Sequence, residues 1–180
     1  MERNALAERV AVATVEAFKE ERAGIELMDC IFPYDPQVSF ETTKYPGVII
    51  LRSRLSPFEI ISILRKCFVS LTHKVVPIQK WAKASIEEIV EACIEIAKIS
   101  IPKNSTFKVE CGKRGRIIKS RSAIERAVGR KIIEEIGCKV SMENPEYIVA
   151  IEVIGKIAGV CIAPKSMIWR RENHFRLPLY

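Results

Sequence analysis

The sequence predicts a mixed α/β (α+β) protein built from two small layered units. Segments with helical spacing alternate with short β-branched runs along the whole chain, which is typical of sheets covered by helices. Three Ser-x-x-Glu motifs mark helix starts. With 48% hydrophobic and 28% charged residues, 180 residues are enough for one substantial core or two small ones. The expected boundary between the two units lies around residues 79–85.

Four helices are expected. The first runs from about Asn4 to Arg22, because Leu6, Val10, Ala13 and Ala17 lie on one side of it, and Gly24 ends it. Each of the other three begins with a capping box, in which Ser and Glu side chains bond the free amides of the first turn. These boxes are Ser56-Pro-Phe-Glu59, Ser85-Ile-Glu-Glu88 and Ser122-Ala-Ile-Glu125. Gly137 is expected as the left-handed cap that closes the last helix.

Seven strands are expected from short β-branched runs bounded by turn residues. They cover residues 25–31, 48–53, 74–78, 107–111, 139–142, 147–154 and 157–163. Gly155-Lys156 predicts a hairpin between the last two strands, and Asn144-Pro145 predicts a turn before them.

Positive charge is concentrated in the second half of the chain. Residues 1–100 hold 13 Lys or Arg and 14 Asp or Glu, whereas residues 101–180 hold 16 and 8. Between Lys103 and Lys131 there are ten bases, against only Glu110 and Glu125. Such a distribution is expected of a face that binds a polyanion, and a solvated charged face is the alternative.

The candidate binding site is the segment from Cys111 to Ser122, which leads from a strand into a capped helix. The free amides and the positive dipole end of such a helix start favour a phosphate. The bases expected to bind RNA are Lys113, Arg114, Arg116, Lys119 and Arg121 in this segment, with Arg126 and Arg130 on the exposed side of the helix. Ion pairs of Arg130 with Glu134 and of Lys131 with Glu135 are an alternative role on the helix, and they leave the bases before it free.

The sequence predicts no catalytic residue, no metal site and no cofactor. The six cysteines are scattered singly without C-x-x-C spacing, so we expect buried, reduced thiols. His73 and His174 lack neighbours that suggest a catalytic dyad. Phosphate-binding and dinucleotide-binding glycine motifs are absent. Because no apolar run approaches the roughly 20 residues that span a bilayer, and the N-terminus is charged, we expect a cytoplasmic protein without membrane contact.

Two aromatic features have competing interpretations. The tail from Trp169 to Tyr180 is basic and aromatic, so it could stack on unpaired bases, although packing on its own domain is the commoner role. Trp81, at the domain junction, is interpreted as a packing residue.

Several motifs together resemble the THUMP domain family over about Lys80 to Pro164. They are Phe107-Lys-Val109, the basic Lys113-Arg114, the helix from Ser122, Lys139-Val-Ser-Met-Glu-Asn-Pro145 and Ile148-Val-Ala-Ile-Glu-Val-Ile-Gly155. Upstream, Tyr45-Pro-Gly-Val-Ile-Ile-Leu-Arg52 and Ser56-Pro-Phe-Glu-Ile-Ile61 are similar to the ferredoxin-like domain that precedes THUMP in many tRNA-modifying proteins. The strand that normally opens that domain is not expected here, so its sheet is incomplete or differently connected. This resemblance divides the chain into a ferredoxin-like domain (1–80), a THUMP domain (81–164) and a tail (165–180).

The resemblance implies a tRNA-binding protein that is not itself an enzyme. THUMP domains deliver tRNA to a modifying activity, and no such catalytic domain is expected in the residues after the THUMP-like hairpin. The free-standing members that this chain most resembles are adaptors for the RNA cytidine acetyltransferase that makes 4-acetylcytidine in tRNA. The alternatives are a protein that docks on ribosomal RNA or on an acidic partner, and a small RNA-modifying enzyme. The oligomeric state is left open.

Overall fold

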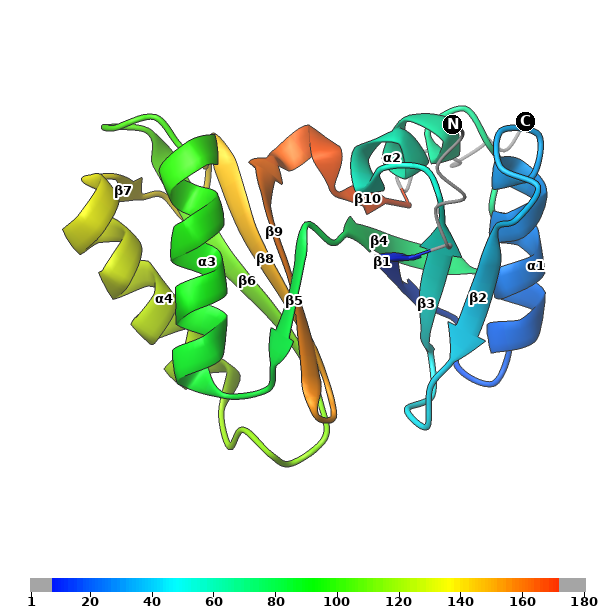
Figure 1. Ribbon diagram of the computed structural model, residues 1–180, viewed down its shortest axis with the longest axis horizontal. Helices are drawn as coiled ribbons and strands as arrows, with labels where there is room; N and C mark the ends of the chain where they lie inside the picture. Colours follow the sequence, from blue (N-terminus) through cyan, green and yellow to red (C-terminus); the bar gives the residue numbers. More distant parts are fainter. Residues whose placement is uncertain (1–7, 172–180) are drawn as a thin grey trace, which may run out of the picture.

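The computed structural model describes residues 8–171 as two five-stranded sheets that pack face to face (Figure 1). Helices α1 and α2 pack on the outer face of the first sheet, and α3 and α4 on the outer face of the second. The result is four layers, helix–sheet–sheet–helix, which confirms the predicted α+β class. No helix in the described part of the chain is long and apolar enough to cross a membrane.

The first domain is a complete ferredoxin-like unit. Its elements are β1 (Glu8–Val15), α1 (Glu20–Ile31), β2 (Ser39–Thr42), β3 (Val48–Ser53), α2 (Pro57–Leu64) and β4 (Thr72–Pro77). The strand order β4-β1-β3-β2, with every pair antiparallel, is that of the β-α-β-β-α-β motif. A fifth strand, β10 (Trp169–Arg170), returns from the end of the chain and pairs with β4.

The predictions for the first 31 residues were wrong. The segment expected as the first helix contains β1, the central strand of the sheet, so the opening strand is present. Because both faces of β1 are covered, apolar residues follow one another and hide the period of two. The strand expected over residues 25–31 is part of α1, whose buried stripe is Ala23, Leu27 and Ile31. Gly24 lies inside this helix, where a methyl group would come within 2.5 Å of the Phe40 ring.

The second domain contains β5 (Lys80–Lys83), α3 (Ile86–Ser100), β6 (Thr106–Arg114), α4 (Arg121–Ile136), β7 (Lys139–Val140), β8 (Tyr147–Ile154) and β9 (Ile157–Pro164). Its strand order is β5-β9-β8-β6-β7, and β6 runs parallel to both of its neighbours. A single turn of 3-10 helix (Lys165–Met167) leads from β9 to β10. The short edge strands β2, β5 and β10 were not predicted, and β7 is two residues shorter than expected.

The two sheets share a core of their own. Along β8, Val149, Ile151 and Val153 pack toward the helices, whereas Ile148 and Ile154 pack against the first sheet. Double coverage explains why β8 is a continuous apolar run.

A buried charge pair crosses the sheet–sheet core. Glu152 of β8 is 3% exposed and bonds the Lys74 ammonium of β4. Gly112, opposite Glu152 in the neighbouring strand, leaves the space that this carboxylate fills. The pair therefore joins the two sheets from inside.

The predicted helix starts were confirmed in two cases out of three. Ser56 and Glu59 form a full capping box, and the Ser85 hydroxyl accepts a hydrogen bond from the Glu88 amide. The Ser122 box was wrong, because α4 begins at Arg121 and its N-cap, Ser120, makes no side-chain cap. Gly137 has φ of 78° and closes α4 as expected.

Candidate nucleic-acid interface

The basic segment begins in a strand rather than in a loop. Strand β6 continues through Lys113 and Arg114, which pair with Val153 and Ile154 of β8. Neighbouring residues of a strand point to opposite faces of the sheet, so these two bases diverge. The Lys113 ammonium donates to the Gly115 carbonyl at 2.6 Å and therefore serves the turn that follows. The RNA-binding role expected of Lys113 and Arg114 stays a prediction, with the two side chains on opposite faces of the sheet.

The true loop, residues 115–120, is anchored at several points. Ile118 is buried in the core beneath the helices. The Gly155 amide donates to the Arg114 carbonyl at 3.0 Å, which ties the loop to the β8–β9 turn. Glu125, expected to cap α4, instead accepts a hydrogen bond from the Cys111 amide at 3.2 Å. With no acidic residue in the first turn of α4 and no side-chain cap, the amides there remain available to an anion.

Five bases predicted for the site lie exposed on this loop and on α4. These five are Arg116, Lys119, Arg121, Arg126 and Arg130. None of the five forms an ion pair with another described residue. The predicted pair of Lys131 and Glu135 is present at 2.9 Å, whereas Arg130 has no such partner among the described residues. We refer to the five bases Arg116, Lys119, Arg121, Arg126 and Arg130 as the α4 basic surface. Its charge is not neutralised from within the described chain.

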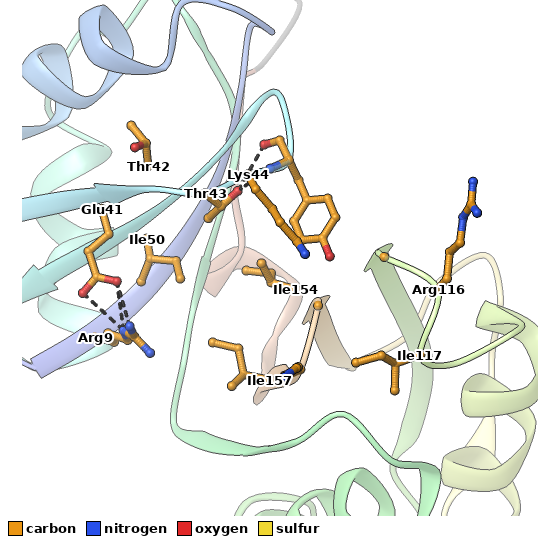
Figure 2. A pocket seen from close by; sticks show the side chains of 14 residues that line it. Arg9, Glu41, Thr42, Thr43, Lys44, Ile50, Arg116, Ile117, Ile154 and Ile157 are labelled. Atoms are coloured by element: carbon orange, nitrogen blue, oxygen red, sulfur yellow. Dashed lines mark hydrogen bonds and ion pairs between the residues drawn. The ribbon is translucent and has the colours of Figure 1, made fainter.

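An open groove of about 1070 Å³ separates the loop from the first domain. One wall is the β2–β3 turn with Lys44, and the other is formed by the loop and the β8–β9 turn with Arg116 and Lys156. Figure 2 shows Ile154 and Ile157 between these walls, with Ile117 on the loop side. The groove therefore combines apolar side chains with bases on both sides, which suits an unpaired nucleotide strand.

A charge network closes one end of the groove. The Glu41 carboxylate accepts a hydrogen bond from Arg9 at 2.8 Å, which Figure 2 shows, and another from Arg52 at 2.6 Å. Burial opposes its ionisation, but the two arginines outweigh that effect and lower the pKa of Glu41. The Glu41 carboxylate therefore holds the Arg9 and Arg52 side chains together at this end of the groove.

Comparison with known protein families identifies the second domain. Residues 83–163 match the family model described as the THUMP domain. The second domain is a THUMP domain. Comparison of the whole sequence with those of curated proteins gives no match.

Solved structures with the same fold extend over both domains. PH1313 from Pyrococcus horikoshii Ot3 aligns with a TM-score of 0.66 and 18% identity, over 87% of this chain and 54% of that one. TrmN from Thermus thermophilus aligns with a TM-score of 0.57 and 19% identity, over 85% and 45%. A 4-thiouridine synthetase in complex with RNA and ATP aligns with a TM-score of 0.53 and 15% identity, over 89% and 42%. The chain thus spans about half the length of these proteins, and the likeness is one of fold.

Three groove bases escaped the sequence analysis. Arg9 and Lys44 come from the first domain, and Lys156 is the second residue of a turn recognised only as a hairpin. Each is isolated in the sequence, so no local cluster marks it. Only the packing of the ferredoxin-like domain against the THUMP domain brings Arg9 and Lys44 to the groove that Arg116 and Lys156 line from the other side.

Metal-binding side chains do not gather in the described part of the chain. No three His, Cys, Asp or Glu side chains are placed to hold a metal ion within residues 8–171. Burial raises the pKa of the Cys93, Cys111 and Cys161 thiols to about 12, so they stay protonated and unreactive at neutral pH. His73 lies 2.7 Å from the Arg171 guanidinium on the surface of β4, and His174 is outside the described residues.

Both aromatic features are packing residues where the structure describes them. The Trp169 ring packs against the core of the first domain, and the Trp81 indole donates to the Arg9 carbonyl at 2.9 Å. Arg170 forms an ion pair with Glu110 across the two sheets. The remainder of the predicted stacking tail, residues 172–180, lies outside the described residues.

Proposed function

We propose that this protein binds tRNA through the α4 basic surface and the adjoining groove. The observation that carries the proposal is a set of five exposed bases on a THUMP domain, none of which forms an ion pair within residues 8–171, beside a helix start without a side-chain cap. Guanidinium groups suit phosphate oxygens, since they can donate two parallel hydrogen bonds. The fold shared with the RNA-bound 4-thiouridine synthetase supports the same interpretation.

We further propose that the protein is a non-catalytic adaptor, which presents tRNA to a separate modifying enzyme. The motifs shared with free-standing THUMP proteins favour an RNA cytidine acetyltransferase as that enzyme. The exposed bases of the α4 basic surface are the side chains on which this proposal rests.

Sequencing of captured RNA tests the first proposal. The purified protein is mixed with total cellular RNA, and the bound species are sequenced. We expect enrichment of tRNA over ribosomal RNA. Enrichment of ribosomal RNA would contradict the proposal and favour a ribosome-docking protein instead.

Reconstitution tests the adaptor role. The protein alone, incubated with tRNA and acetyl, methyl or sulfur donors, should leave the tRNA unmodified. Adding it to an RNA cytidine acetyltransferase should raise the yield of 4-acetylcytidine. Modification that copurifies with this protein alone would contradict the adaptor role.

A further inference from the structure

Tyr45 connects the two domains at the groove. It belongs to the β2–β3 turn of the first domain, and its hydroxyl lies against two glycines of the THUMP domain. A methyl group placed on Gly115 would come within 2.7 Å of the Tyr45 hydroxyl, and one placed on Gly155 within 3.0 Å. These two glycines have φ of 97° and 61°, so both the space and the backbone conformation favour glycine.

The turn that carries Tyr45 is held from within the first domain. The Tyr45 amide donates to the Thr43 hydroxyl at 3.1 Å, and that hydroxyl lies 3.1 Å from the Val48 carbonyl. The Gly47 amide donates to the Glu20 carboxylate at 2.5 Å, which attaches the same turn to the start of α1. Hydrogen bonds within the first domain therefore fix the backbone that carries the Tyr45 ring.

The glycines that Tyr45 contacts lie where the basic loop leaves its strand. Gly115 is the first loop residue, directly before Arg116, and its carbonyl is held by the Lys113 ammonium. Gly155 lies directly before Lys156 and donates to the Arg114 carbonyl. Tyr45 thus contacts the backbone directly before Arg116 and directly before Lys156, the bases of the two THUMP segments that line the groove.

We propose that Tyr45 is a positioning residue, which sets the width of the groove and fixes Arg116 and Lys156 opposite Lys44. The Lys44 ammonium lies 5.4 Å from the centre of the Tyr45 ring, so the ring also orients the base on its own wall. The inference rests on the proposed RNA binding, because spacing between bases matters only if one strand contacts both walls. Replacing Tyr45 removes no charge, so its effect on RNA binding can be distinguished from the loss of a base.

The first test replaces Tyr45 with alanine and measures tRNA affinity over a range of salt concentrations. We expect affinity to fall roughly tenfold and the slope of log K against log salt to become shallower by about one phosphate contact. A shallower slope without loss of charge indicates that bases have lost their common spacing. Tyr34→Ala is the matched control, since Tyr34 is 60% exposed and does not line the groove. If both variants bind alike with the slope of the parent, the proposal is wrong.

A double-mutant cycle tests the contact itself. Gly115→Ala should weaken tRNA binding, since its methyl group meets the Tyr45 hydroxyl. Tyr45→Phe keeps the ring and should bind almost normally. In the Tyr45→Phe background the penalty of Gly115→Ala should shrink by about threefold or more, because the nearest remaining contacts are 3.3 and 3.4 Å away. Additive effects would overturn the proposal.

Thermal melts of the same four proteins separate this inference from the proposed function. The coupling between Gly115→Ala and Tyr45→Phe should also appear in the melting temperature, which needs no RNA. If the parent protein binds no tRNA while the thermal coupling persists, the proposed function fails and the interdomain contact stands. If tRNA binds but neither measurement shows coupling, the positioning role fails alone.

Discussion

Replacing Arg116 with alanine tests the α4 basic surface most specifically. Arg116 is exposed, forms no ion pair within the described residues and lines the groove, so its removal should not disturb the fold. A hydrogen bond to a charged group contributes roughly 1.5 to 3 kcal/mol, and an exposed site stands at the lower end. We therefore expect affinity for tRNA to fall by about 1 to 2 kcal/mol, which is roughly 5- to 30-fold.

The assay is filter binding at several salt concentrations. Each phosphate contact contributes roughly 0.7 to 0.9 to the slope of log K against log salt, so Arg116→Ala should reduce the slope by about that amount. Arg65→Ala is the matched control, because Arg65 is an exposed arginine at the end of α2 that has no ion pair among the described residues. Figure 1 shows α2 at the opposite edge of the molecule from the β2–β3 and β8–β9 turns. Equal slopes for the two variants would refute the reasoning.

Three further predictions concern single side chains. Arg114→Ala should weaken tRNA binding by about 1 to 2 kcal/mol, and Arg114→Lys should recover part of the loss in the same assay, because an ammonium lacks the planar fork. Burial disfavours ionisation of Asp35, but hydrogen bonds outweigh burial and lower the pKa of Asp35 to about 2. The ionised carboxylate therefore stabilises the fold above pH 4, and this stabilisation is lost as the pH falls toward 2. In acid titrations monitored by circular dichroism, the free energy of unfolding of Asp35→Asn should fall by about 2 kcal/mol less than that of the parent over this window. Lys74→Ala should lower the free energy of unfolding in urea by about 3 to 5 kcal/mol, since it leaves the buried Glu152 carboxylate without its partner. A Lys74→Ala/Glu152→Gln double variant that is no more stable than Lys74→Ala would contradict this.

The sequence predicted those elements whose pattern is local. Strands β3, β8 and β9 appear close to their expected limits, because each is a β-branched run between turn residues. The capping boxes at Ser56 and Ser85 located α2 and α3 for the same reason. Strand β1 was mistaken for a helix, since burial on both faces removes the alternation that identifies a strand.

Elements and contacts that depend on distant partners were not predictable. Strands β5 and β10 are four and two residues long, and each is defined by the strand that it pairs with. The bases on α4 were found because they are close in sequence. The opposite wall of the groove, with Lys44 and Tyr45, was missed because it lies some 70 residues earlier in the chain. Local charge thus identified one half of the candidate site, and tertiary packing supplies the other half.

The salt dependence of tRNA binding by the unaltered protein tests the central claim most directly. If the five bases of the α4 basic surface each neutralise one phosphate, log K should fall against log salt with a slope of roughly −3.5 to −4.5. Affinity should then drop on the order of a hundredfold between 50 and 200 mM salt. A flat response, with tRNA still bound, would contradict the account, because it would remove the α4 basic surface from the interface.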